Sequence, residues 1–192
     1  MHPVRNLLTL SALLGWLVGS GALSGEPARP KLAKPEIPGI TYFTQLSDSS
    51  GFAGEVVGFG GTTAPESMTE LHAAGFATVI NMRLAAERGA QVEASRAAAE
   101  KAGLGYVHLP YNPVNAPPEI LDEFIAAVGN AGDQPVYIHC SSATRITGLW
   151  MAARVLIDGW DIEAAAQEAA AIAGRPERAV ELGTSLIESR RR

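Results

Sequence analysis

Short apolar runs alternate with amphipathic segments along most of the chain. Runs rich in strand-forming residues predict three strands, at Phe76–Met82, Tyr106–Leu109 and Val136–His139. Apolar positions at helical spacing predict helices between and after them. The first opens at a capping box, Thr63–Glu66, and stops at Gly75. The others cover Ala85–Lys101, Asn115–Val128, Ile146–Leu156, Asp161–Ala173 and Glu177–Glu188.

This order of elements defines the expected fold. Strands that alternate with helices are typical of a parallel sheet with helices on both faces. The sequence therefore predicts an α/β fold with a mainly parallel sheet flanked by helices. We expect this domain to occupy residues 41–192.

The N-terminal 40 residues have a different pattern. Residues 1–24 combine one early positive charge, a short apolar run and small residues, which is the order of a secretory signal peptide. Residues 25–40 contain four prolines and few large apolar residues, which indicates an extended linker. We therefore expect an exported protein, periplasmic or secreted, or one anchored in the membrane if the signal is not cleaved.

Charge and composition exclude several classes of function. The formal net charge of the 192-residue chain is −5, which argues against general nucleic-acid binding. The single cysteine, Cys140, cannot form an internal disulfide. No group of histidine, cysteine and acidic residues has the spacing of metal ligands, so we expect neither a metal nor another cofactor.

The segment from His139 to Arg145 carries the chemistry. Cys140 follows an apolar strand, and Arg145 stands where the next helix begins. Amide groups and the dipole at a helix N-terminus stabilise anions, so they favour the thiolate of Cys140 and attract a phosphate-like group. A guanidinium group binds two oxygens of such an anion in a fork. We therefore expect Cys140 to act as nucleophile and Arg145 as anion clamp.

The chain from Phe43 to about Ala173 resembles the phosphatase-like domain family of beta-lactamase hydrolase-like proteins in bacteria, within the cysteine-dependent tyrosine and dual-specificity phosphatase-like superfamily. The resemblance is carried by Gly60–Gly61, Met68–Arg83, Gly105–Pro110 and His139–Trp150. It implies a phosphoric monoester hydrolase in which Cys140 forms a thiophosphate intermediate and Arg145 stabilises the transition state. The loop residues Ser141, Ser142, Ala143 and Thr144 would bind the substrate, and His139 would support the loop through a hydrogen bond to its backbone.

Two departures from the phosphatase signature keep alternatives open. Four residues rather than five separate Cys140 from Arg145, and Ala143 stands where a glycine is expected. That spacing resembles rhodanese-type sulfurtransferases, in which a sulfur donor would leave a persulfide on Cys140. A non-catalytic anion-binding module is a third interpretation.

The general acid that would protonate the leaving oxygen is also missing from its expected place. Residues 111–117 contain no carboxylate, and Glu119, just beyond, is a weak candidate because acids are common in the first turn of a helix. No second basic patch is visible that would identify the phosphate ester. The sequence predicts neither the substrate nor the oligomeric state.

Overall fold

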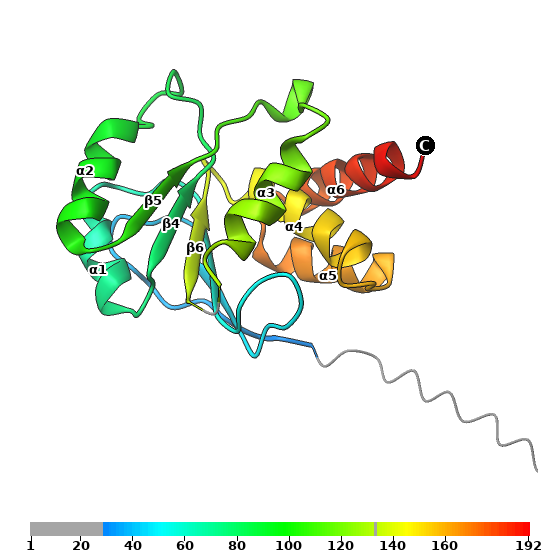
Figure 1. Cartoon of the computed structure of the whole chain (residues 1–192), viewed down its shortest axis with the longest axis horizontal. Helices are drawn as coiled ribbons and strands as arrows, with labels where there is room; N and C mark the ends of the chain where they lie inside the picture. Colours follow the sequence, from blue (N-terminus) through cyan, green and yellow to red (C-terminus); the bar gives the residue numbers. More distant parts are fainter. Residues whose placement is uncertain (1–28, 133) are drawn as a thin grey trace, which may run out of the picture.

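The computed structural model describes residues 29–132 and 134–192 as one α/β unit (Figure 1). Six strands form one sheet in the order β1-β2-β3-β6-β4-β5. The strands are β1 (Lys31–Ala33), β2 (Thr44–Ser47), β3 (Val57–Gly60), β4 (Thr78–Asn81), β5 (Gly105–His108) and β6 (Val136–His139). Strands β3, β6, β4 and β5 are parallel, so the predicted mainly parallel sheet is confirmed. The predicted signal peptide lies outside the described residues.

Helices cover both faces of the sheet, as predicted (Figure 1). On one side, α1 (Ser67–Ala73) and α2 (Val92–Ala102) contact each other and enclose a smaller apolar core. The larger core lies under α3 (Ile120–Gly129), α4 (Thr144–Leu156), α5 (Ile162–Ile172) and α6 (Pro176–Arg191). Burial of this apolar surface is the main favourable contribution to folding. None of the helices in residues 29–132 and 134–192 is both long enough and apolar enough to span a bilayer.

The sheet extends beyond the predicted strands on its antiparallel side. Strand β1 pairs with β2, and β2 pairs with β3, both antiparallel. Because β1 lies within residues 25–40, the segment predicted as a linker contributes an edge strand, and ordered structure begins before Thr41. The three β1 residues are exposed. This segment therefore lacks the apolar run from which a strand is predicted.

Three predicted helix starts were wrong. Helix α3 begins at Ile120 rather than at Asn115, which instead ends a short 3-10 helix over Pro113–Asn115. The capping box at Thr63 does not form: helix α1 begins at Ser67, and the Thr63 hydroxyl instead pairs with the Tyr137 hydroxyl at 2.7 Å. Helix α2 begins at Val92 rather than Ala85, because residues 84–90 form turns stabilised by Glu87. The predicted cap at Asp161 is confirmed, since its side chain accepts hydrogen bonds from the amides of Glu163 and Ala164.

Helix α6 packs closely against α4 through two glycines. A Cβ atom at Gly148 of α4 would lie 2.7 Å from Leu182, and one at Gly183 of α6 would lie 2.6 Å from Met151. Larger side chains at either position would separate the helices. This contact places the first turns of α6 beside the start of α4.

Candidate functional site

The predicted site residues lie at the C-terminal edge of the parallel sheet. Cys140 directly follows β6, the strand between β3 and β4, and a short loop leads to α4. In open α/β sheets, ligands bind outside the carboxyl ends of the strands. The fold therefore brings Cys140, the loop and Arg145 to the edge where a binding site is expected.

Hydrogen bonds from outside the loop fix its backbone. The Gly174 amide donates to the Ser142 carbonyl at 2.9 Å, the Thr62 hydroxyl donates to the Ser141 carbonyl at 3.3 Å, and the Thr147 amide donates to the Ala143 carbonyl at 3.1 Å. The Cys140 amide donates to the Gly60 carbonyl at 3.2 Å. The carbonyls of Ser141, Ser142 and Ala143 are thus all held by donors from outside the loop.

Amide groups at the start of α4 remain available to an anion. The first amides of a helix have no intrahelical acceptor. Within residues 29–132 and 134–192, the amides of Ser141, Thr144 and Arg145 also make no other hydrogen bond. These donors, together with the helix dipole, favour a negative charge at this end of α4.

Ala143 adopts the backbone conformation for which a glycine is expected. It lies in the left-handed region at φ 56° and ψ −11°, and its side chain is completely buried. For a residue with a Cβ atom this conformation costs about 1–2 kcal/mol. Alanine, with the smallest side chain that has a Cβ, is accommodated here, and the loop keeps the bend that orients α4.

Cys140 lies at the base of the loop and has no exposed surface. Burial raises the pKa values of Tyr111 and Tyr137 well above the usual range for a phenol, and a negative charge on Cys140 raises both further. The Tyr111 hydroxyl donates to the Arg145 carbonyl at 2.9 Å. Two neutral phenols therefore lie in the electrostatic environment of the thiol, and that of Tyr111 also holds the backbone at the start of α4.

Two backbone carbonyls and one carboxylate fix the position of the Arg145 guanidinium. Its Nη1 donates to the carbonyls of Met82 at 2.5 Å and Tyr111 at 3.0 Å, and its Nη2 pairs with Glu87 Oε1 at 2.7 Å. Its Nε is buried and has no partner among the described residues. Of the five N–H donors of an arginine, the Nε–H and one Nη2–H therefore remain for a ligand. Two such donors can bind two oxygens of one anion.

Glu87 is the site residue that the sequence analysis missed. Its carboxylate accepts the Leu84 amide at 2.9 Å and pairs with Arg83 at 3.3 Å as well as with Arg145. Burial alone would raise the pKa of Glu87, but these three donors together hold it below its ordinary value. Glu87 is therefore ionised at neutral pH and orients Arg145.

His139 lies behind the loop, where its ring stacks on Tyr137 with centroids 5.7 Å apart. The expected hydrogen bond to the loop backbone does not form, because neither ring nitrogen has a partner among the described residues. Burial lowers the pKa of His139 to about 4, although the nearby carbonyls of Cys140 and Gly61 oppose this shift. The ring is therefore neutral at physiological pH.

The buried His139 predicts a pH dependence of stability. An unfolded histidine titrates near pH 6.5, so the unfolded state takes up a proton between about pH 6.5 and 4 while the folded state does not. We expect the free energy of unfolding to fall over that interval by about 3 kcal/mol, at about 1.4 kcal/mol per pKa unit. Urea unfolding at pH 7 and pH 4.5 measures it. In His139→Phe, which keeps the stacked ring, this loss should be smaller, and an equal loss in both proteins would contradict the assignment.

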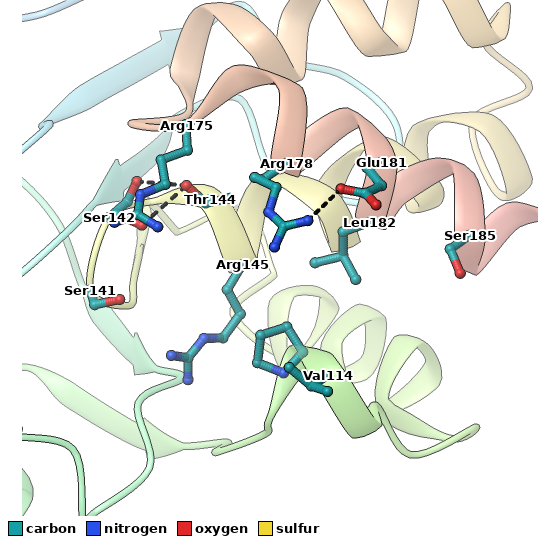
Figure 2. Close-up of a pocket in the computed structure, with 11 residues that line it drawn as sticks. Val114, Ser141, Ser142, Thr144, Arg145, Arg175, Arg178, Glu181, Leu182 and Ser185 are labelled. Carbon is teal, nitrogen blue, oxygen red and sulfur yellow. Dashed lines mark hydrogen bonds and ion pairs between the residues drawn. The ribbon is translucent and has the colours of Figure 1, made fainter.

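A cleft of about 520 Å³ opens beside the loop (Figure 2). Of the predicted substrate-binding residues, Ser141, Ser142 and Thr144 line it together with Arg145, whereas Ala143 does not. The opposite walls come from the 3-10 helix Pro113–Asn115 and from α6. The α6 region contributes Arg175, Arg178, Glu181, Leu182 and Ser185.

The structure supplies no carboxylate where the general acid was sought. In the segment after β5, the Asn112 side chain accepts the Val114 amide at 3.0 Å and caps the short 3-10 helix. Glu119 is exposed and does not line the cleft. Among the described residues that line the cleft, Glu181 is the only carboxylate, and Arg178 pairs with it at 2.8 Å. No group of three or more potential metal-binding side chains is found in the described part of the chain.

Comparison with protein families gives one match. The family described as beta-lactamase hydrolase-like protein, phosphatase-like domain, matches residues 53–157, which is more than half of the chain and includes β3 to α4. No curated protein sequence matches the chain.

Solved structures share the fold. TpbA of P. aeruginosa aligns with a TM-score of 0.59 at 18% identity, over 85% of this chain and 91% of its own. A putative phosphatase from Shewanella putrefaciens CN-32 aligns with a TM-score of 0.57 at 19% identity, over 77% and 92%. The kinase-associated phosphatase KAP, with its catalytic-site cysteine replaced by serine, aligns with a TM-score of 0.56 at 17% identity, over 78% and 93%. The chain therefore has the fold of the cysteine phosphatases.

Proposed function

Because the chain belongs to the phosphatase-like domain family of beta-lactamase hydrolase-like proteins, we propose that it hydrolyses phosphate monoesters through a covalent intermediate on Cys140. The observation that carries the proposal is the placement of the thiol and Arg145 at one sheet edge, with two guanidinium donors and several loop amides left for an anion. A structure of a Cys→Ser variant of TpbA in complex with phosphotyrosine, aligned over 86% of this chain, supports a phosphate ester as substrate.

The reaction divides into two displacements at phosphorus. In the first, the Cys140 thiolate forms a sulfur–phosphorus bond while the bond from phosphorus to the ester oxygen breaks. The ester oxygen leaves as an alkoxide or phenoxide and takes its proton from water. In the second, water attacks the phosphocysteine, releasing inorganic phosphate and the thiolate. The net reaction converts ester and water to alcohol and phosphate.

The residues around the phosphoryl group act by charge and position. The Nε–H and free Nη2–H of Arg145, with the amides of the loop, stabilise the equatorial oxygens as charge develops on them. Glu87 keeps the guanidinium in place, so the donors are preorganised before the substrate arrives. Cys140 has no exposed surface, so the loop must admit the phosphoryl group toward the thiol when the substrate binds.

The lack of a positioned acid predicts a strong preference among leaving groups. Without a carboxyl group to protonate it, the leaving oxygen departs with most of its negative charge. We expect aryl phosphates to react at least about a hundredfold faster than alkyl phosphates, which is the usual contribution of a general acid. Turnover numbers for a series of substituted phenyl phosphates and for alkyl phosphates measure this preference. Similar rates for aryl and alkyl esters, reduced by Glu181→Gln, would instead identify Glu181 as an acid.

The four-residue loop makes sulfur transfer the second candidate function. A direct comparison separates the two: release of phosphate from 4-nitrophenyl phosphate, and formation of thiocyanate from thiosulfate and cyanide, by the same preparation. We expect phosphate release only. Thiocyanate formation with a persulfide on Cys140 and no phosphate release would support the sulfurtransferase, and phosphate binding without turnover would support an anion-binding module.

A further inference from the structure

Two arginines outside the nucleophile loop face the cleft. Figure 2 shows Arg175 and Arg178 on the α6 side, Val114 on the opposite side, and Arg145 between them. The Arg175 side chain makes no hydrogen bond or ion pair with any residue in 29–132 or 134–192. Arg178 pairs with Glu181, but both side chains are largely exposed, at 71% and 65%. Such surface pairs contribute little, so a ligand anion can replace Glu181.

The position of these arginines relative to the loop is fixed by backbone contacts. The amide of Gly174, the residue before Arg175, donates to the Ser142 carbonyl at 2.9 Å. A Cβ atom at Gly174 would lie 2.6 Å from that carbonyl oxygen, so the chain before α6 touches the loop directly. The close packing of α6 on α4 at Gly148 and Gly183 holds the rest of the helix. The two arginines are thus presented at a constant place beside the phosphoryl site.

The cleft contains more guanidinium groups than the proposed reaction at phosphorus uses. Three guanidinium groups and one carboxylate line it, in a chain whose formal net charge is −5. Arg145 and the loop amides already serve the phosphoryl group of the proposed reaction. We propose that Arg175 and Arg178 form a second anion subsite, and that the substrate is a small organic phosphate with a second phosphate or carboxylate group. This inference rests on the proposed function and names its substrate class.

The size and lining of the cleft favour a small molecule. Its volume of about 520 Å³ is within the range of small-ligand sites, about 300–1,000 Å³. Pro113, Val114 and Leu182 add apolar surface between the two cationic regions. A carbon skeleton joining two anionic groups would contact this surface while each end meets arginine.

Calorimetric titration of the protein with methylphosphonate and with alkane-α,ω-bisphosphonates of increasing length tests the subsite. We expect one spacer length to bind at least about tenfold more tightly than methylphosphonate, because the second anion binds intramolecularly. In Arg175→Gln/Arg178→Gln this ratio should fall to about two or less, the statistical advantage of two equivalent ends. Arg96→Gln, the same change on α2, is the matched control and should leave the ratio unchanged.

Three outcomes would overturn the inference. The bisphosphonates bind no more tightly than methylphosphonate at any length, or their advantage survives in the double variant. Alternatively, they show no advantage while hydrolysis of acidic phosphopeptides depends on both arginines, which would make the partner a protein. In each case, continued hydrolysis of 4-nitrophenyl phosphate leaves the proposed function intact, whereas loss of both methylphosphonate binding and turnover counts against the proposed function itself.

Discussion

Replacing Cys140 by serine is expected to reduce phosphate release from an aryl phosphate by more than about a thousandfold, as removal of a covalent nucleophile does in other enzymes. A serine hydroxyl at the end of β6 is a far weaker nucleophile than a thiolate, and no base among the described residues that line the cleft is placed to activate it. The turnover number at saturating substrate measures the loss.

Folding of the Cys140→Ser variant needs its own control because the side chain is completely buried. An unpaired hydroxyl in this environment costs about 1–3 kcal/mol, so the unfolding midpoint should fall without loss of the folded state at 25 °C. Cys140→Ala, which introduces no polar group, should be equally inactive. Substantial turnover by either variant would exclude Cys140 as the nucleophile.

Replacing Arg145 by lysine is expected to lower the turnover number by about 100- to 1,000-fold, the usual effect of removing one transition-state donor group. Lysine keeps the charge but lacks the planar fork, so it cannot serve Met82, Tyr111 and Glu87 and still present two donors to the phosphoryl group. The affinity for methylphosphonate should fall less than the turnover number, because the lost donors act mainly on the transition state.

Arg154→Lys is the matched control for Arg145→Lys. Arg154 also lies on α4 and is completely buried, where it pairs with Asp158 at 2.8 Å and Glu168 at 3.1 Å. It stands nine residues farther along the helix, about 13 Å from Arg145 at 1.5 Å per residue. We expect Arg154→Lys to lower the free energy of unfolding but not the turnover number of the folded protein. Equal loss of turnover in both variants would show that the Arg145 effect is structural.

The sequence predicted the parallel strands well because they carry clear apolar runs. Strands β4, β5 and β6 were each found, and β6 led directly to the Cys140 loop. Strand β3 was missed because Gly58 and Gly60 are weak strand formers. The structure explains them: a Cβ atom at Gly58 would lie 2.7 Å from the Phe76 ring, and one at Gly60 would overlap the Tyr137 hydroxyl. Aromatic side chains of the smaller core thus leave room only for glycine at these two positions of β3.

The missed site residues depend on contacts that are distant in the sequence. Glu87 was predicted to lie in a helix, but its shortest ion pair is with Arg145, 58 residues away. Arg175 and Arg178 begin 30 residues after Arg145, and only the close packing of α6 on α4 brings them to the cleft. The Cys140 loop could be predicted as an anion site because the thiol, the amides and the guanidinium belong to six consecutive residues.

In the proposed reaction, the Cys140 thiolate carries the phosphoryl group during turnover. Rapid acid quench of the enzyme with 4-nitrophenyl phosphate, followed by mass spectrometry of the peptide that contains Cys140, tests it most directly. We predict that the mass of this peptide rises by one phosphoryl group within the first turnover, with a matching burst of nitrophenol, and that the increment is lost as phosphate is released. Turnover with an unmodified Cys140 peptide at every time point, or a phosphoryl group on another residue, would contradict the account.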